Sequence, residues 1–262
     1  MNAKRKIERV VLIGSGNVAW NLVQVLPVVQ VYARDAKKAA ETGTLGNVPY
    51  ISDLKDITQD ADLYLISISD DSVHGFSEKL IKHIPSGAIV AHTSGTLPMD
   101  AIEAPNRGVF YPLQTFSKYK KVDFTEIPIL IEGSDEHITN ALEELGHRVS
   151  RRVSLMDSAQ RKQLHIGAVL VCNFTNRLYA LAQERLGVQN ISFDLLKPLI
   201  KESVGKMLDH NGKISDLQTG PAIRGDVHIM GEHMKMLEDN EEIREIYRIL
   251  SNSINKNNNG KL

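Results

Sequence analysis

The stretch Val10-Val11-Leu12-Ile13-Gly14-Ser15-Gly16-Asn17-Val18-Ala19 decides the fold. Its first four residues form an unbroken apolar run, which predicts a parallel strand buried on both faces. A glycine turn follows, and residues 17–26 then show the periodicity of a helix. The order strand, glycine turn, helix is typical of the unit that binds a dinucleotide.

Each small residue of this G-x-G-x-x-A pattern has a physical reason. Gly14 permits the tight turn, Gly16 lets a pyrophosphate approach the backbone, and Ala19 lets the helix pack closely on the strand. The start of the helix would direct free N–H groups and its positive dipole end toward the phosphates. The turn therefore predicts cofactor contacts from Gly14, Ser15, Gly16, Asn17 and Val18. A ligand-free turn is the alternative, and the strand that follows the helix disfavours it.

The residue after the second strand indicates which dinucleotide is bound. A fold that selects NAD usually carries an acid about 20 residues past the glycines, and this chain has Arg34 at that distance, after a strand expected over residues 28–33. A planar guanidinium suits a 2′-phosphate, with Lys37 or Lys38 as a second cation, so the sequence favours NADP. Asp35 could be the NAD acid displaced by one or two positions, but it is better explained as the N-cap of a helix over residues 36–41.

Further short apolar runs predict the rest of a doubly wound parallel sheet. Strands are expected at residues 49–51, 62–68, 88–91, 107–111, 127–132 and within 148–153, with helices at 73–84 and 135–145. In such a sheet, ligands bind beyond the carboxyl ends of the strands. Polar residues at those ends are therefore candidates for the site.

Three strand ends carry such residues. Ser69 and Asp70 follow one strand and are expected to border the cofactor; Asp70 with Asp71 could instead be a catalytic pair, or cap the next helix. Ser94, beside a glycine, could bind a substrate carbonyl or carboxylate or simply belong to a polar turn, and no G-x-S-x-G motif marks it as a nucleophile. Gln114 lies in a proline turn after the strand over 107–111, where it could contact substrate.

Beyond residue 156 no strand pattern remains, and segments 157–186, 193–208, 221–237 and 241–254 predict helices. We therefore expect an α/β protein in which an N-terminal Rossmann domain (residues 1–153) is followed by an all-α domain (154–262). His165 and Asn173 lie eight residues apart on the first helix. A histidine can move the proton that accompanies hydride transfer, and an amide can orient substrate. A buried histidine and an asparagine bonded within the packing are the structural alternative.

Another polar candidate, Arg224, lies in the glycine-rich segment 219–226. It could bind a substrate carboxylate or pair with Asp226, which could cap the following helix. His228 and His233 are five residues apart, which misses the i, i+4 spacing of a helical zinc site, and no His-Glu-x-x-His motif is present. No metal is predicted.

The composition limits the partners. Lys and Arg number 31 against 32 Asp and Glu, so the net charge of -1 gives no reason to expect nucleic acid or an anionic membrane. The single cysteine, Cys172, excludes an intrachain disulfide and a cysteine-cluster metal site. No apolar run approaches the roughly 18 residues of a membrane span, and no signal peptide is evident. These features predict a soluble, cytoplasmic protein.

The motifs at 14–19, 69–71, 92–95, 112–116, 165–173 and 220–226 together resemble a known family. It comprises Rossmann-like proteins with a DUF2520 domain, labelled NADP oxidoreductases and related to coenzyme-F420-dependent NADP reductases. The wider group includes 6-phosphogluconate dehydrogenase and pyrroline-5-carboxylate reductase. The resemblance implies a homodimer through the helical domain and a substrate cleft between the domains.

Two positions depart from the wider superfamily. Its hydroxyacid dehydrogenases carry a lysine four residues before the helix asparagine, where this chain has Val169, so His165 is the available proton donor. Tyr111 stands where related chains tend to have histidine.

The resulting hypothesis is an NADPH-dependent reductase of a C=O or C=N bond in a small metabolite. Its catalytic residues would be His165, Asn173 and Ser94, and its substrate-binding residues Gln114 and Arg224. A non-catalytic NADP-binding sensor is the alternative, and an arogenate or prephenate dehydrogenase relative would share the architecture.

Overall fold

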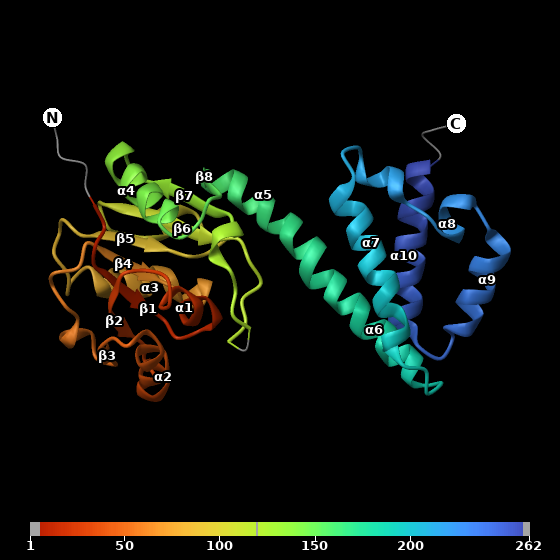
Figure 1. Ribbon diagram of the computed structural model, residues 1–262, viewed down its shortest axis with the longest axis horizontal. Helices are drawn as coiled ribbons and strands as arrows, with labels where there is room; N and C mark the ends of the chain where they lie inside the picture. Colours follow the sequence, from red (N-terminus) through yellow and green to blue (C-terminus); the bar gives the residue numbers. More distant parts are fainter. Residues whose placement is uncertain (1–5, 119, 259–262) are drawn as a thin grey trace. The chain divides into compact units, whose positions relative to one another are not determined.

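The computed structural model describes residues 6–118 and 120–258. The chain divides into two compact units, Met1–Cys172 (the sheet unit) and Asn173–Leu262 (the helical unit). Figure 1 shows the elements of each. Helix α5 (Ser158–Ala168) is thus grouped with the sheet, while the functional division expected between residues 153 and 154 stays a prediction.

One eight-stranded sheet forms the centre of the sheet unit, in the order β3-β2-β1-β4-β5-β6-β7-β8. Neighbouring strands are parallel except β6 and β7, which are antiparallel. The chain leaves β1 for β2 on one side and later reaches β4 on the other, so the topological switch point lies between β1 and β4. This confirms the predicted Rossmann-like sheet. The strands are β1 (Val10–Ile13), β2 (Val28–Tyr32), β3 (Tyr50–Ile51), β4 (Leu63–Ile66), β5 (Ile89–His92), β6 (Arg107–Pro112), β7 (Ile129–Gly133) and β8 (Val153–Leu155).

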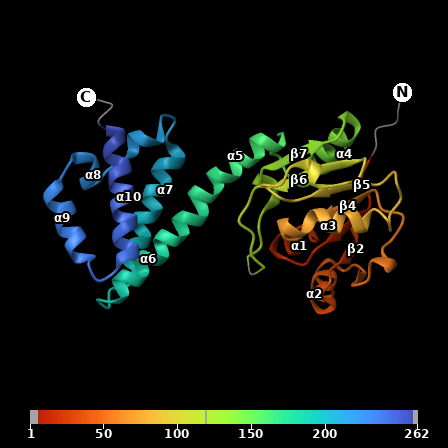
Figure 2. The same cartoon turned by 180° about the vertical axis from the view of Figure 1, so that it is seen from behind.

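Helices cover both faces of this sheet. Alternate residues of β1 point to opposite faces, with Val10 and Leu12 in one buried cluster and Val11 and Ile13 in the other. Helices α1 (Asn17–Leu22) and α4 (Glu136–His147) complete the first cluster, and α3 (Asp70–Leu80) completes the second. Figure 2 shows α3 lying across the sheet. Helix α2 (Ala36–Gly46) packs beside β2 and β3.

Several predicted boundaries were wrong, and the end of α1 and the start of β8 each have a local cause. Helix α1 ends at Leu22 instead of residue 26, because the following residues tighten into turns, with the Val25 amide bonding to the Leu22 carbonyl. Helix α3 begins at Asp70 instead of residue 73. Strand β8 begins only at Val153, because the amides of residues 149 and 150 both bond to the Gly146 carbonyl and close a turn there.

The described part of the helical unit contains helices and no strand, as predicted. The helix expected over 157–186 is interrupted by a π-helix (Val169–Phe174), and the one expected over 221–237 breaks at Gly225, which has φ +66°. The Asp226 carboxylate caps α9 by accepting from the Ile229 amide, which confirms its N-cap role. The helices are α6 (Thr175–Gly187), α7 (Lys197–Asp209), α8 (Pro221–Arg224), α9 (Val227–Met236) and α10 (Glu241–Asn258). None of the described helices combines the length and apolar character that crossing a membrane requires.

Short 3-10 turns complete the description. They are η1 (Leu54–Asp56), η2 (Met99–Ala101) and η3 (Phe124–Glu126) in the sheet unit, and η5 (Phe193–Leu196) and η6 (Ile214–Leu217) in the helical unit. Of these, η2 bears on the site, because it follows the loop that leaves β5.

Candidate functional site

A cavity of about 930 Å³ runs along the carboxyl ends of β1, β2, β4, β5 and β6 in the sheet unit. This is the edge at which ligands of doubly wound sheets bind. The structure brings together there most of the residues that the sequence predicted, namely Gly14, Ser15, Gly16, Asn17, Val18, Arg34, Ser69, Asp70, Ser94, Gln114 and His165.

The two glycines of the first turn have different structural roles. Gly14 has φ +129°, and a Cβ on it would lie 2.0 Å from the carbonyl oxygen of Ser67. Gly16 is the N-cap of α1 with extended backbone, and a Cβ there would meet nothing within 4 Å. Gly14 is therefore required by the fold itself, whereas Gly16 leaves open space beside the cavity.

Cations gather at the β2 end of the cavity. Arg34 and Lys38 line it, and Lys37 is not among the lining residues. The Asp35 carboxylate accepts hydrogen bonds from the backbone amides of residues 37 and 38, at 3.0 and 3.1 Å, which confirms that it caps α2. The acid, which also lines the cavity, is thus bonded to the start of a helix and lies 3.9 Å from the Lys38 ammonium, while the Arg34 guanidinium is the other cation at this end.

At the β4 and β5 ends, hydrogen bonds join Asp70 to the loop after β5. The Asp70 carboxylate accepts from the hydroxyls of Ser94, at 2.8 Å, and Thr96. Ser69 is the N-cap residue of α3, so the capping role considered for Asp70 and Asp71 is wrong; both lie in the first turn, where their charge complements the helix dipole.

The Ser94 hydroxyl is fully engaged within the protein. It donates to Asp70 and accepts from the amides of Thr96 and Leu97, each at 3.1 Å. A hydroxyl has one donor and two acceptor positions, so all three are in use. This arrangement disfavours the substrate contact expected of Ser94 and makes it an organiser of the loop.

His92 also stabilises the loop after β5 through hydrogen bonds. Its Nδ1 accepts from the Ser94 amide at 3.1 Å, and its Nε2 donates to the Pro98 carbonyl at 3.2 Å. The side chain is buried, and this burial lowers the pKa of His92 from its ordinary 6.5 to about 4. The imidazole is therefore neutral at physiological pH and serves the loop as a hydrogen-bonding spacer.

The buried imidazole makes folding of the sheet unit sensitive to acid. Because the folded-state pKa is lowered, the His92 contribution is complete above pH 6.5 and is lost as the pH falls toward 4. Between pH 8 and pH 5 we expect the free energy of unfolding to fall by about 2 kcal/mol through this group. His92→Gln, which can keep both hydrogen bonds without titrating, should flatten that part of the pH dependence in urea denaturation. An unchanged slope would contradict the assignment.

Tyr111 and His165 meet at the β6 end. The Tyr111 hydroxyl lies 3.1 Å from Nδ1 of His165, and both residues line the cavity. Burial raises the pKa of the Tyr111 phenol; the charge of Arg161 opposes this and that of Asp70 adds to it. The phenol therefore keeps its proton throughout the physiological range.

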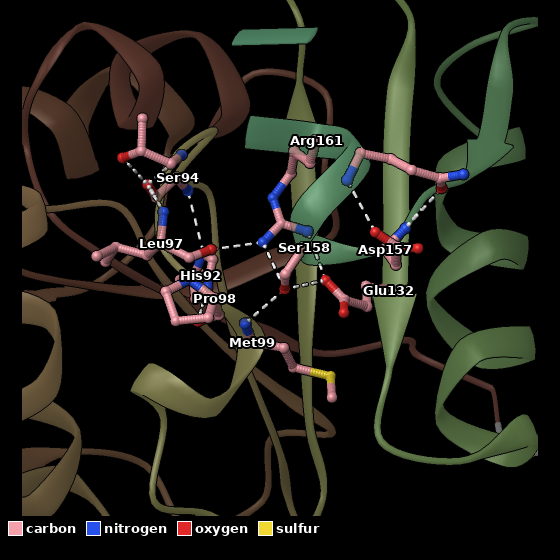
Figure 3. Close-up of polar contacts among 11 residues, drawn as sticks. His92, Ser94, Leu97, Pro98, Met99, Glu132, Asp157, Ser158 and Arg161 are labelled. Atoms are coloured by element: carbon pink, nitrogen blue, oxygen red, sulfur yellow. Dashed lines mark hydrogen bonds and ion pairs between the residues drawn. The ribbon is translucent and has the colours of Figure 1, made fainter. Parts of the chain in front are cut away.

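A buried arginine supports this part of the site (Figure 3). Arg161 on α5 is fully buried and forms an ion pair with Glu132 at 2.5 Å. Its guanidinium also donates to the Leu97 carbonyl and to the Ser158 hydroxyl. Ser158 in turn donates to Glu132 and accepts from the Met99 amide. The network ties α5 and β7 to the end of the loop that follows β5.

Comparisons with known proteins identify relatives of this chain. Residues 127–254 match the model of a family described as a domain of unknown function, DUF2520. The structure of a candidate NADP oxidoreductase from Bacteroides fragilis is 39% identical and aligns over 97% of this chain and 100% of its own, with a TM-score of 0.89. The chain belongs to the DUF2520 family.

More distant structures share the fold of this DUF2520 protein. A pyrroline-5-carboxylate reductase from Coxiella burnetii is 15% identical, with 97% of this chain and 98% of that chain covered and a TM-score of 0.59. A reductive aminase from Aspergillus terreus, in complex with NADPH and ethyl-5-oxohexanoate, is 13% identical, with 95% and 93% covered and a TM-score of 0.68. The search of curated proteins found no match.

Two predicted site residues of the DUF2520 chain do not line the cavity. Asn173 lies in the π-helix and Arg224 ends α8; both are exposed and belong to the helical unit. Within the described chain, no ion pair links Arg224 to Asp226. Their contact with substrate stays a prediction. Across residues 6–118 and 120–258, no three His, Cys, Asp or Glu side chains are grouped to hold a metal ion.

The sequence marked Tyr111 only as a departure from related chains, and it predicted no site role for Tyr111, Thr96 or Arg161. A usable signal existed for each. Tyr111 stands at the carboxyl end of a strand, Thr96 follows Ser94 in the same polar turn, and Arg161 precedes His165 by one helical turn and so shares its face. The sequence could not predict which residue each of these side chains contacts.

Proposed function

We propose that the chain is an NADP(H)-dependent oxidoreductase that reduces a C=O or C=N bond of a small metabolite. One observation carries the proposal: a single cavity joins a glycine turn and two cations at its β1 and β2 ends to a hydroxyl, phenol and imidazole cluster at its β5 and β6 ends. The names of the Bacteroides fragilis and Aspergillus terreus proteins support the same chemistry.

The residues at the first end fit a dinucleotide phosphate. The open space over Gly16 is a cradle that a Cβ would fill, and Ser15 and Asn17 flank it. Arg34 and Lys38 would hold the 2′-phosphate that distinguishes NADP from NAD. When bound, the reduced nicotinamide supplies the hydride.

At the other end, the chain's own groups would handle the substrate. Gln114 is exposed at the rim and would orient a polar group of the substrate. His165 would supply the proton that the reduced heteroatom takes up. Asp70 would hold the loop after β5 through its two hydroxyl partners. The roles of Asn173 and Arg224 at the substrate's polar end rest on the resemblance.

The helical unit would serve as a dimer interface. The family resemblance implies this role, and the unit exposes large apolar side chains, among them Leu195, Leu199 and Leu208 at 73%, 61% and 71%. Exposed apolar groups of this size are typical of surfaces that another chain covers.

The Arg34 assignment predicts a cofactor-specific effect. Arg34→Ala should weaken NADPH binding by about 10- to 100-fold, the size of a lost charged hydrogen bond, while NADH binding is unchanged. Isothermal titration calorimetry with both nucleotides measures this. Lys37→Ala is the matched control, because it removes a neighbouring cation that does not line the cavity. If Arg34→Ala bound NADPH as tightly as the wild type does, the assignment would be overturned.

Turnover is tested by incubating the full chain with NADPH and a panel of keto acids and cyclic imines while following the nicotinamide absorbance. Oxidation with any member supports a reductase. Tight NADPH binding without oxidation across the panel would favour the sensor instead.

A further inference from the structure

The contact between Tyr111 and His165 joins two separate parts of the sheet unit inside the cavity. Tyr111 comes from the carboxyl end of β6 and His165 from α5, 54 positions later, and their side chains lie 3.1 Å apart at the hydroxyl and Nδ1. The rings are tilted by 58° with centroids 6.2 Å apart, so the contact is made by the polar atoms and not by stacking.

Gly95 leaves the room that this contact needs. A Cβ at residue 95 would lie 2.5 Å from Nδ1 of His165 and 2.9 Å from the Tyr111 hydroxyl oxygen. The polar atoms of the pair therefore lie directly against the loop after β5, at the point where Asp70 fixes that loop through Ser94. Any side chain at position 95 would push the two rings apart or out of place.

The chemistry of the two groups assigns the nitrogens of the imidazole. The Tyr111 phenol keeps its proton, because burial raises its pKa. A phenol can donate to a bare ring nitrogen and can accept from a protonated one. The phenol can therefore bond to Nδ1 whether His165 is neutral or charged. A hydrogen bond at one ring nitrogen leaves the other nitrogen for other partners, so the bond at Nδ1 leaves Nε2 available.

We propose that Tyr111 is a positioning residue that occupies Nδ1 of His165 in both charge states, so that Nε2 is the atom that exchanges a proton with substrate. This inference rests on the proposed function for the substrate, but the occupation of Nδ1 is a property of the protein alone.

Protons are balanced at each step of the proposed reduction. The charged imidazole gives its Nε2 proton to the substrate heteroatom as the adjacent carbon takes the hydride of the reduced nicotinamide. The ring is then neutral, with its remaining proton on Nδ1 and the Tyr111 oxygen as acceptor. Water returns a proton to Nε2, and Tyr111 itself gains and loses none. Tyr111 thus keeps the ring in place through the cycle without being consumed as an acid.

The direct test is ¹⁵N NMR of the ligand-free full chain, at high pH where imidazoles are neutral. His165 signals are assigned by their absence in His165→Asn. Tyr111→Phe removes only the hydroxyl, and we expect the Nδ1 shift of His165 to move toward the value of an exposed histidine such as His147, by more than Nε2 moves. Tyr50→Phe, on an exposed tyrosine of β3, should leave both shifts unchanged. An unmoved Nδ1 in Tyr111→Phe would overturn the inference.

A second variant perturbs the contact without altering either partner. Gly95→Ala should reproduce the Nδ1 change, whereas Gly87→Ala, where a Cβ meets nothing within 4 Å, should not. This variant keeps the inference falsifiable if Tyr111→Phe folds poorly. With a substrate from the panel, Tyr111→Phe should lower kcat about 10- to 100-fold, as loss of an orienting partner does, with NADPH affinity unchanged.

The two hypotheses fail separately. Absent NADPH binding together with the expected NMR change would reject the reductase and leave the Tyr111–His165 bond standing. Normal NADPH binding with an unmoved Nδ1 would reject the positioning role alone.

Discussion

Arg161→Met is expected to lower the free energy of unfolding of the sheet unit by about 3–5 kcal/mol. The arginine is fully buried, and its removal leaves the Glu132 carboxylate, whose side chain is only 17% exposed, without its cation. An uncompensated charge in such a place costs several kcal/mol. The Leu97 carbonyl also loses a donor, so the loop after β5 loosens. Urea denaturation followed by the fluorescence of Trp20, the chain's single tryptophan, measures the sheet unit directly.

Arg152→Met is the matched control for this prediction. Its ion pair with Glu126 is exposed, at 64% and 55%, so its loss should cost less than about 1 kcal/mol. The double variant Arg161→Met with Glu132→Leu should recover most of the stability, because replacing both members of a buried pair by apolar groups is often neutral. Recovery is favoured further because Nε of Arg161 has no hydrogen-bond partner within the described chain. Equal losses for Arg161→Met and Arg152→Met would contradict the account.

The sequence predicted the cofactor end of the cavity because that end is built from short-range pattern. The glycine turn, the strand before it and Arg34 lie within 25 residues, and the alternation of buried residues along β1 fixes where the turn emerges. The polar ends of β4, β5 and β6 followed from one rule, that parallel strands present their carboxyl ends at the same edge. The predicted residues line one cavity because each follows a parallel strand, and the parallel strands all end at this edge of the sheet.

The proton-handling end could not be predicted in the same way. The partner of His165 is 54 positions away in the sequence, and Glu132, the partner of Arg161, is 29 positions away on β7. Such pairs depend on how α5 packs on the sheet, which no local period encodes. Ser94 illustrates the limit: its residue type suggested a substrate contact, and only the positions of two backbone amides and Asp70 show that its hydroxyl is already occupied.

Gly14→Ala is expected to lower stability and Gly16→Ala to lower NADPH affinity, although the two glycines are two residues apart in the same turn. At Gly14 a Cβ would lie 2.0 Å from the Ser67 carbonyl oxygen and 2.8 Å from its carbon. The backbone there also has φ +129°, which L side chains rarely adopt. Both atoms belong to Ser67, the residue directly after β4, and its amide is held by a hydrogen bond to the Ile13 carbonyl at 2.7 Å. The neighbour cannot move without breaking the sheet edge, so we expect a loss of at least about 3 kcal/mol of stability.

Gly16→Ala should leave the fold intact and weaken NADPH binding. A Cβ there meets nothing within 4 Å, and the φ of -77° suits any residue, so Trp20 fluorescence should report a stability equal to or slightly above that of the wild type. The new methyl group would occupy space that the pyrophosphate needs, and we expect at least about a tenfold loss of affinity, or 1.4 kcal/mol. Calorimetric titration with NADPH measures it. Unchanged affinity in Gly16→Ala would remove the pyrophosphate from this turn, and wild-type stability in Gly14→Ala would show that the turn does not pack against β4. The pair thus separates what the first turn does for the fold from what it does for the ligand.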